Sequence, residues 1–361
     1  MTATSDRAHG ALLGLAAGDA SGFPAAYHRM IGSWRRGTLW SQAAELDSSH
    51  VNKFPLPFSL SDPLEGSAFS ATDDAEQAAL GASILLRALD LGDGLPSADH
   101  LFAAWRELVL PQRDAYWGSV ADRSAILNAE DGLTPPATGS DNPHFYDDSS
   151  VARAVPAGIV FAGDPGEAVR VARALAAITN DGVGVDAAGA FAAAIAVVVD
   201  GGPVEAAVTR ALAEVPEDSW FTRKYRLAET ILVEAGSAFA AVPRWSDEVS
   251  NLEYNFGNVA AETVPLALII AREASTFSEG IGVANLIPKQ ADTMPAMVGA
   301  LLGGAGGTAV VPSTWRERVE VLRGVCVPST RGVAFHGLAD RLVAARGRVP
   351  LTTEERRRVG G

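Results

Sequence analysis

A succession of alanine-rich segments with helical spacing is the feature that most constrains the fold of this chain. The clearest segment runs from Asp73 to Leu91, where apolar side chains recur at positions 75, 78, 79, 82, 85, 86 and 89 behind two acidic residues. This spacing lines one face of an α-helix, and acidic residues favour the first turn of a helix. Alternating β-branched residues, which would indicate strands, are scarce. The pattern predicts an all-α protein.

Further segments of the same character are separated by strong helix breakers such as Gly163-Asp164-Pro165 and Asn180-Asp181-Gly182. The segment 185–199 is almost wholly apolar, so its helix should be buried on all sides. Two stretches, 23–71 and 130–148, are poor in helix signals and are expected to be long loops of the kind that carry function. We expect helices over residues 7–17, 73–91, 150–161, 165–178, 185–199, 204–215, 218–236, 258–274, 276–286, 292–303, 312–324 and 330–346.

Charge and cysteine content narrow the class of protein. The 361 residues contain 29 Lys and Arg against 43 Asp and Glu, which gives a net charge of −14. Nucleic acids and anionic membranes require a basic field, so neither is expected as a partner. The single cysteine, Cys326, excludes an intramolecular disulfide and a thiolate-rich metal site. Because the sequence shows no signal peptide and no long uninterrupted apolar run, we expect a cytoplasmic protein, and this class consists mostly of enzymes.

Two acidic clusters stand directly before apolar helical segments. Thr72-Asp73-Asp74 opens the segment at 73–91, and Asp292-Thr293 opens the segment at 292–303. Hydroxyl and carboxylate oxygens are the donors that Mg²⁺ and Ca²⁺ prefer. The same residues could instead be helix caps, with their acids facing the helix dipole. Because the two clusters are alike, they could also share one cation.

Two other kinds of site are not indicated by the sequence. The six histidines show no HxxxH or HExxH spacing, so a zinc hydrolase is not expected. The glycine-rich run from Gly303 to Gly307 follows an expected helix and not a strand, so it is not a dinucleotide-binding fingerprint. We expect this run to let two helices approach closely and then to end one of them.

Four segments, in order, resemble the ADP-ribosylglycohydrolase family, which includes the dinitrogenase-reductase-activating glycohydrolases. They are GALLGLAAGDASGFP (10–24), SATDDAEQAAL (70–80), SSVARAVPAGIVFAGDPGEAVRVARALAAIT (149–179) and ADTMPAMVGALLGGAGG (291–307). The segments cover the chain end to end at compatible spacings. The resemblance implies a single domain over residues 1–361, folded as the orthogonal helical bundle of this family.

The resemblance also implies a catalytic site. Members of the family bind two Mg²⁺ ions between the two acidic motifs, hold the terminal ribose and a water there, and hydrolyse the bond at C1″. By this resemblance, Thr72, Asp73 and Asp74 match the first metal motif, and Asp292 and Thr293 match the end of the second. The catalytic carboxylates are then Asp73, Asp74 and Asp292, which would orient or deprotonate the water.

The chain departs from the family pattern where acids are expected. Gln290 stands where the second metal motif has its first Asp, and Lys289 stands where a Gly is usual. Ala26 lies in the run where the family commonly has a Glu near the reacting ribose. The loss of two acids predicts one weaker Mg²⁺ ion, or none. As a hypothesis, the ammonium of Lys289 occupies part of the vacated charge space.

The central motif and the opening turn each allow more than one interpretation. Asp147, Asp148 and Ser149 stand near the phosphate contact of the family, but two carboxylates would repel a diphosphate. These acids could supply an acid or base, recognise a cationic ligand, or cap the helix that follows. Arg153 either contacts a ligand or pairs with an internal acid, and Asp19 either orders the metal site or caps a neighbouring helix. The candidate substrate-binding residues are Asp19, Asp147, Asp148, Ser149, Arg153, Lys289 and Gln290.

Three functions are compatible with these features. The first is Mg²⁺-dependent hydrolysis of an N- or O-ribosyl bond in an ADP-ribosylated protein or small molecule. The second is a repurposed enzyme of the same fold that acts on another nucleotide- or NAD-derived metabolite, which the lost acids and Asp147-Asp148 favour. The third is a non-catalytic nucleotide-binding protein. The presence of Thr72, Asp73 and Asp74 argues against this third function, because such a protein would be free to lose them.

Overall fold

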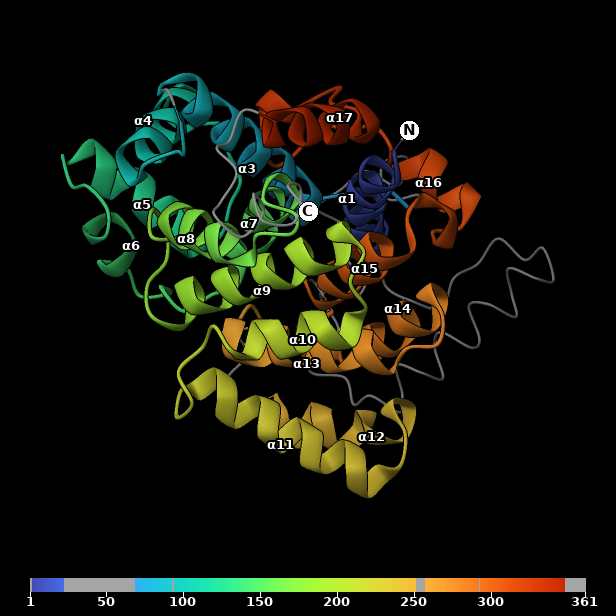
Figure 1. Cartoon of the computed structure of the whole chain (residues 1–361). Coiled ribbons are helices and arrows are strands. Elements are labelled where there is room, and N and C mark those ends of the chain that lie inside the picture. Colours follow the sequence, from blue (N-terminus) through green and yellow to red (C-terminus); the bar gives the residue numbers. More distant parts are fainter. Residues whose placement is uncertain (1, 23–68, 93, 251–256, 292, 348–361) are drawn as a thin grey trace, which may run out of the picture.

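The computed structural model describes residues 2–22, 69–92, 94–250, 257–291 and 293–347. Over these ranges the chain forms helices and no strands, which confirms the predicted all-α class (Figure 1). Two isolated β-bridges join Asp147 to Val259 and Val321 to Ala334. The α-helices are α1 (Ala3–Gly22), α3 (Asp73–Asp90), α4 (Ala98–Val109), α5 (Val120–Glu130), α6 (Ala137–Ser140), α7 (Ser149–Val160), α8 (Pro165–Ala176), α9 (Val183–Asp200), α10 (Val204–Leu212), α11 (Trp220–Ala235), α12 (Ala238–Arg244), α13 (Ala260–Glu273), α14 (Phe277–Asn285), α15 (Met294–Gly306), α16 (Ser313–Val319) and α17 (Phe335–Arg346).

Most predicted helices occur close to their predicted ends, but α1 differs. The sequence predicts that this helix ends before Gly18-Asp19, whereas the structure continues it to Gly22. The reason is tertiary, because the glycines of α1 face another helix instead of a turn. At the other end of the chain, the helix predicted over 312–324 stops at Val319.

The helices α4, α5 and α12 were not predicted from the sequence. Each begins at a serine whose side chain accepts a hydrogen bond from the first turn: Ser97, Ser119 and Ser237. Ser119 also forms a reciprocal capping box with Asp122. These caps were readable signals. The loop predicted over 130–148 is interrupted by the short helix α6, and most of the loop predicted over 23–71, including Ala26, lies outside the described residues.

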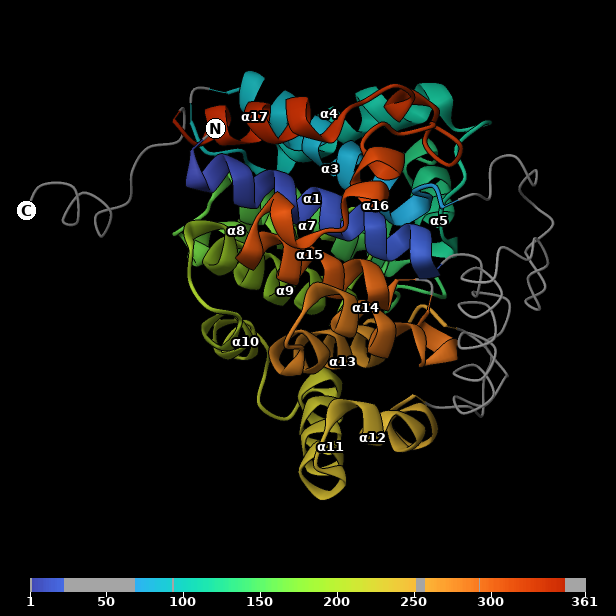
Figure 2. The ribbon, with the colours of Figure 1, turned by 90° about the vertical axis from the view of Figure 1, so that its right-hand side faces the viewer.

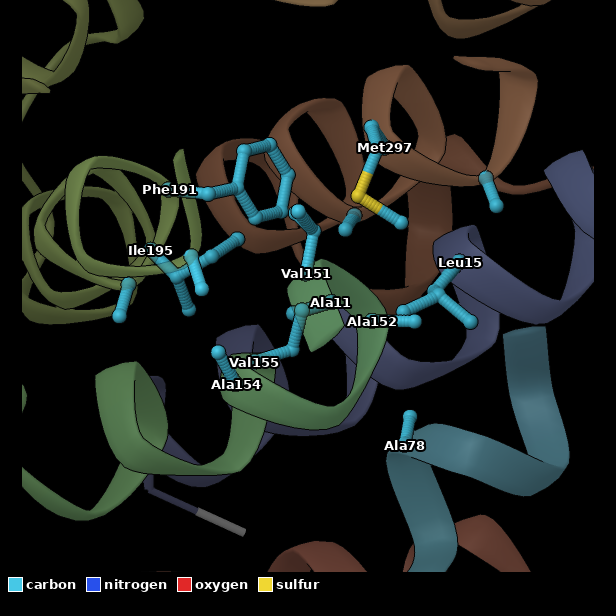
Figure 3. Packing of buried hydrophobic residues seen from close by; sticks show 14 of the residues in the cluster. Ala11, Leu15, Ala78, Val151, Ala152, Ala154, Val155, Phe191, Ile195 and Met297 are labelled. Atoms are coloured by element: carbon cyan, nitrogen blue, oxygen red, sulfur yellow. The ribbon is translucent and has the colours of Figure 1, made fainter. Parts of the chain in front are cut away.

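The buried centre of the fold is built around α9, which packs against α7, α8 and α10. Figure 3 shows Phe191 and Ile195 of α9 beside Val151 of α7 and Met297 of α15. By length and composition α9 could cross a membrane, and it is the one described helix of which this is true. However, 72% of it is buried inside the protein, as expected for a helix at the centre of a fold.

Helices α1 and α15 run antiparallel and in close contact (Figure 2). Gly10 faces Gly303, and Gly14 faces Gly299, so that a Cβ atom on any of these four residues would overlap a backbone carbonyl oxygen of the other helix. Further along α1, Gly18 and Gly22 face Pro295 and Ala291 in the same way. The predicted role of the run from Gly303 to Gly307 is confirmed, because Gly303 permits the contact and Gly307 follows the last residue of α15 with φ +73°.

We predict that Gly14→Ala destabilises the protein by at least about 2 kcal/mol, because the new Cβ would overlap the carbonyl oxygen of Gly299. The matched control is Gly282→Ala in α14, where nothing lies within 4 Å of the added atom. There the better helix propensity of alanine should stabilise the protein by about 0.5–1 kcal/mol. Urea unfolding of the three proteins measures both effects. Equal stabilities for the two variants would contradict the close helix contact.

Candidate functional site

Helices α3 and α7 pack against each other near their N-terminal ends. The guanidinium of Arg153, the fifth residue of α7, donates a 2.9 Å hydrogen bond to Gln77, the fifth residue of α3. One turn further along α3, Gly81 lies directly against the backbone of Arg153. The motif Thr72-Asp73-Asp74 and the pair Asp147-Asp148 therefore stand at the same end of two packed helices.

Asp19 links the last turn of α1 to the start of α3. Its carboxylate accepts hydrogen bonds from the backbone N–H of Thr72 at 2.6 Å, the backbone N–H of Ala75 at 3.1 Å and the Thr72 hydroxyl. The Ala75 N–H is a donor that the N-cap residue of a helix usually satisfies with its own side chain. The structure thus shows Asp19 as a cap on a neighbouring helix, which is the second of its two predicted roles.

Carboxylates crowd at the start of α3. Thr72 is the N-cap residue of this helix but makes no capping hydrogen bond with its side chain; its hydroxyl donates to Asp19 and, at 3.3 Å, to Asp73. Asp74 is buried in the same turn. Burial, and then the negative charge of Asp73, raises the pKa of Asp19 well above its usual range. Helix capping therefore does not account for the side chain of Thr72.

Asp148 connects α7 to α13 and α15. One carboxylate oxygen accepts a 2.6 Å hydrogen bond from the Thr263 hydroxyl, and the other accepts a 3.4 Å hydrogen bond from the Thr293 hydroxyl. Asp148 occupies the N-cap position of α7 without a capping hydrogen bond from its side chain, and Thr293 does the same at α15. The starts of α7 and α15 therefore meet through these side chains. Asp292 lies outside the described residues.

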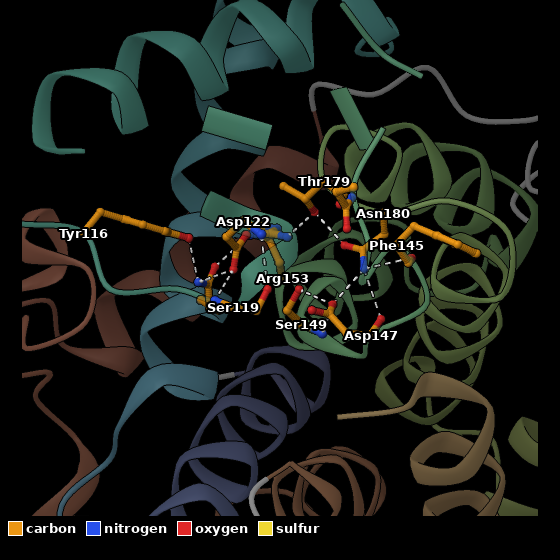
Figure 4. A network of polar contacts seen from close by, with 11 residues as sticks. Tyr116, Ser119, Asp122, Phe145, Asp147, Ser149, Arg153, Thr179 and Asn180 are labelled. Atoms are coloured by element: carbon orange, nitrogen blue, oxygen red, sulfur yellow. Dashed lines mark hydrogen bonds and ion pairs between the residues drawn. The ribbon is translucent and has the colours of Figure 1, made fainter. Parts of the chain in front are cut away.

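Asp147 belongs to a buried polar network (Figure 4). Its Oδ1 atom accepts hydrogen bonds from the Ser149 hydroxyl at 2.7 Å and from the Asn180 amide at 2.8 Å. Its Oδ2 atom is buried and has no hydrogen-bond partner in the described part of the chain. Burial, and then the negative charge of Asp122, raises the pKa of Asp147.

Arg153 lies at the centre of the same network and is fully buried. It forms an ion pair with Asp122 at 2.6 Å and donates a hydrogen bond to the Thr179 hydroxyl, also at 2.6 Å. Thr179 in turn donates to Asn180, which completes the connection to Asp147. Of the two predicted roles of Arg153, the structure shows the internal pair with an acid.

Lys289 and Gln290 form a second buried cluster with Glu262 of α13. The Lys289 ammonium lies 2.9 Å from Glu262 Oε2, and the Gln290 amide donates to the same oxygen at 2.8 Å. The side-chain oxygen of Gln290 accepts a 2.7 Å hydrogen bond from the Ser250 hydroxyl. All four side chains are almost completely inaccessible to solvent.

The acids that bind Arg153, Lys289 and Gln290 were not predicted from the sequence. Asp122 could have been found as the second half of the Ser119 capping box, although nothing in the sequence pairs it with Arg153. Glu262 stands one residue before Thr263 in an apolar helix, where an acid implies a buried partner. Glu76, which was noted only as part of the first motif, accepts hydrogen bonds from three successive backbone N–H groups, of Val325, Cys326 and Val327.

The chemistry of the first motif fits Mg²⁺, but only in part. Thr72, Asp73 and Asp74 offer the hard oxygen donors that this ion binds. In the described ranges, no group of three or more His, Cys, Asp or Glu side chains is arranged to hold a metal ion. The part of the second motif at Lys289 and Gln290 presents an ammonium and an amide that are already hydrogen-bonded. The donors at α3 could therefore hold one cation. The described residues of the second motif offer no matching set for a second, and Asp292 lies outside them.

We predict that Arg153→Met lowers the free energy of unfolding by about 3–5 kcal/mol, because it leaves the buried carboxylate of Asp122 without its cation. As a control, Arg87→Met breaks the exposed pair between Arg87 and Glu107 and should change stability by less than about 0.5 kcal/mol. Chemical denaturation measures both values. A stable Arg153 variant that had lost only ligand binding would contradict the structural role.

The raised pKa of Asp147 predicts a pH-dependent contribution to stability. Well below the ordinary Asp pKa of about 3.9, the carboxyl is protonated in both the folded and the unfolded protein. As the pH rises towards the raised folded pKa, the unfolded protein loses its proton first, so Asp147 increasingly destabilises the folded protein. Asp147→Asn should therefore become more favourable, relative to the wild type, as the pH rises from about 4 to about 7. Urea unfolding across this range tests the prediction, with Asp131→Asn at an exposed position as the control.

Comparisons with known proteins agree with this architecture. The sequence profile of the ADP-ribosylglycohydrolase family matches residues 1–350. A solved structure described as an ADP-ribosylglycohydrolase-related protein complex is similar with a TM-score of 0.60 and 19% sequence identity, over 96% of this chain and 100% of that chain. At this identity the similarity shows the fold alone, and no curated protein sequence matches significantly. Because the profile covers nearly the whole chain, the chain belongs to the ADP-ribosylglycohydrolase family, which supports a glycohydrolase-type activity.

Proposed function

We propose that this protein hydrolyses the N- or O-glycosidic bond at C1″ of a ribosyl group in an ADP-ribosylated protein or small molecule. The observation that carries this proposal is the meeting of the end of α1 with the starts of α3, α7 and α15. Hydrogen bonds that Thr72 donates to Asp19 and Thr293 donates to Asp148 join these helix ends. They gather carboxylates and hydroxyls at one place from segments far apart in the sequence.

The reaction requires a water, a place for developing positive charge and a proton acceptor. The water oxygen bonds to C1″ as the bond from C1″ to the leaving nitrogen or oxygen breaks, and the leaving group takes up a proton. Asp73 or Asp74 would orient the water and accept its proton, while nearby negative charge stabilises the cationic ribose in the transition state. We propose the same roles for Asp292, by its place in the second motif.

Mg²⁺ is part of this proposal as one ion at the start of α3. When bound there, it would fix the ribose hydroxyls and lower the pKa of a water. The residues that would hold it are Thr72, Asp73 and Asp74, with Asp292 and Thr293 contributing from the start of α15. Asp19 supports these ligands indirectly, because it accepts the hydrogen bonds of Thr72 and Ala75 that fix the first turn of α3.

A second candidate is hydrolysis of a different nucleotide- or NAD-derived metabolite. It is favoured by the buried pair Asp147 and Asp148, which stands at the start of α7. A helix N-terminus by itself attracts phosphate, but two adjacent carboxylates oppose that attraction. A ligand with fewer phosphates than ADP-ribose, or with a cationic group, would be accommodated more easily there.

A substrate panel distinguishes the candidates. The protein is incubated with ADP-ribosyl-arginine, ADP-ribosyl-serine and a set of NAD-derived nucleotides, each with Mg²⁺ and with EDTA. Release of ADP-ribose that stops with EDTA supports the first function. Turnover of only a non-ADP-ribosyl nucleotide supports the second, and binding without any turnover would contradict both.

We predict that Asp73→Ala lowers kcat on whichever substrate is turned over by about 10²- to 10⁴-fold, because it removes a carboxylate that handles the water. The matched control is Asp114→Ala, since the Asp114 side chain is 97% exposed on the surface. This control should leave kcat unchanged. Circular dichroism confirms that both variants are folded, and an active Asp73 variant would show that the site lies elsewhere.

A further inference from the structure

The buried cluster of Lys289, Gln290 and Glu262 lies beside the second acidic motif and is not used by the proposed reaction. A fully buried carboxylate and a fully buried ammonium are rare unless they are paired. Here the pair is close, at 2.9 Å, and belongs to two different segments, α13 and the turn before α15. The charge of Glu262 is thus balanced inside the fold by a residue of the motif itself.

The side-chain oxygen atoms of this cluster that could bind a metal ion already accept hydrogen bonds. Glu262 Oε2 accepts hydrogen bonds from both Lys289 and Gln290. The side-chain oxygen of Gln290, which is its one possible metal ligand, accepts the hydroxyl hydrogen of Ser250 at 2.7 Å. A divalent cation placed here would have to break these hydrogen bonds and approach a positive charge.

Asp148 shows how near this cluster comes to the acids of the site. Its carboxylate accepts from Thr263, the residue that follows Glu262 in α13, and from Thr293, which lies four residues after Lys289. The two segments that carry the Lys289–Glu262 pair are therefore the same two segments that supply the hydroxyls bound to Asp148. In this buried setting the attraction between the Lys289 ammonium and the Glu262 carboxylate is strong.

We infer that the ammonium of Lys289, held by Glu262, takes the place of one divalent cation at the second acidic motif, so that the protein binds at most one divalent cation in this site. The inference rests on the proposed function, because it concerns the same site. It assigns Lys289 as a positioning residue whose ion pair with Glu262 fills the place where a cation would bind. The single remaining ion then belongs to the motif Thr72-Asp73-Asp74.

The test counts bound Mn²⁺ on the full chain by electron paramagnetic resonance, with Mg²⁺ titrated by calorimetry as a second probe. The wild type should bind no more than about one ion per chain. Gln290→Asp restores an acid but keeps Lys289, and should bind no more than the wild type. The double variant K289G/Q290D also removes the ammonium, and should bind about one ion more. Lys224→Met is the matched control, because Lys224 is a half-buried lysine whose ammonium is held by the backbone carbonyl oxygens of Glu248 and Val249.

Several results would overturn the inference. Two ions bound to the wild type would overturn it, and so would an additional ion bound to Q290D. The absence of an additional ion in a folded K289G/Q290D would also overturn it. If circular dichroism shows that the double variant does not fold, the counts for the wild type and for Q290D still decide. A wild type that binds no ion, with a double variant that gains one, supports the inference and contradicts only the Mg²⁺ dependence of the proposed function.

Discussion

The contact between α1 and α15 is the constraint on which the rest of this structure depends. Its glycines let two backbones meet where any side chain would overlap a carbonyl oxygen. Because the helices are antiparallel, the last turn of α1 lies beside the start of α15, which puts Asp19 next to the segment that carries the second acidic motif. The contact that packs the fold therefore also brings the two motifs to one end of the bundle.

The charged residues around that end are of two kinds. Arg153 with Asp122, and Lys289 with Glu262, are buried pairs that balance each other inside the fold. Such pairs fix the positions of α5, α7, α13 and the turn before α15 more than they add to stability, since desolvation offsets their attraction. At the start of α3, by contrast, burial and then the negative charge of Asp73 raise the pKa of Asp19, so the carboxylates there repel each other. Repulsion of this kind is relieved by a bound cation or by a substrate that develops positive charge.

The family fold and the residues at the starts of α3 and α7 and before α15 are consistent with the function that we propose. The fold is shared with the ADP-ribosylglycohydrolase family over nearly the whole chain. At the start of α3 the chain carries a hydroxyl and two acids, whereas Lys289 and Gln290, before α15, are both hydrogen-bonded to Glu262. Our proposals describe a glycohydrolase that binds at most one divalent cation and has two acids, Asp147 and Asp148, at the start of α7.

The sequence by itself determined the helical class, most helix positions and the motif Thr72-Asp73-Asp74, because periodicity, caps and breakers are local properties of the chain. Only the tertiary structure decided which partner each charged residue has. Asp122 lies 31 residues from Arg153, and Glu262 lies 27 residues from Lys289, and no local pattern encodes such pairings. It also decided that α1 continues through Gly18 and Asp19, since a glycine looks like a helix end until the opposing helix shows that it is a close contact. Burial and long-range hydrogen bonding, which depend on the whole fold, are the physical reason for this division.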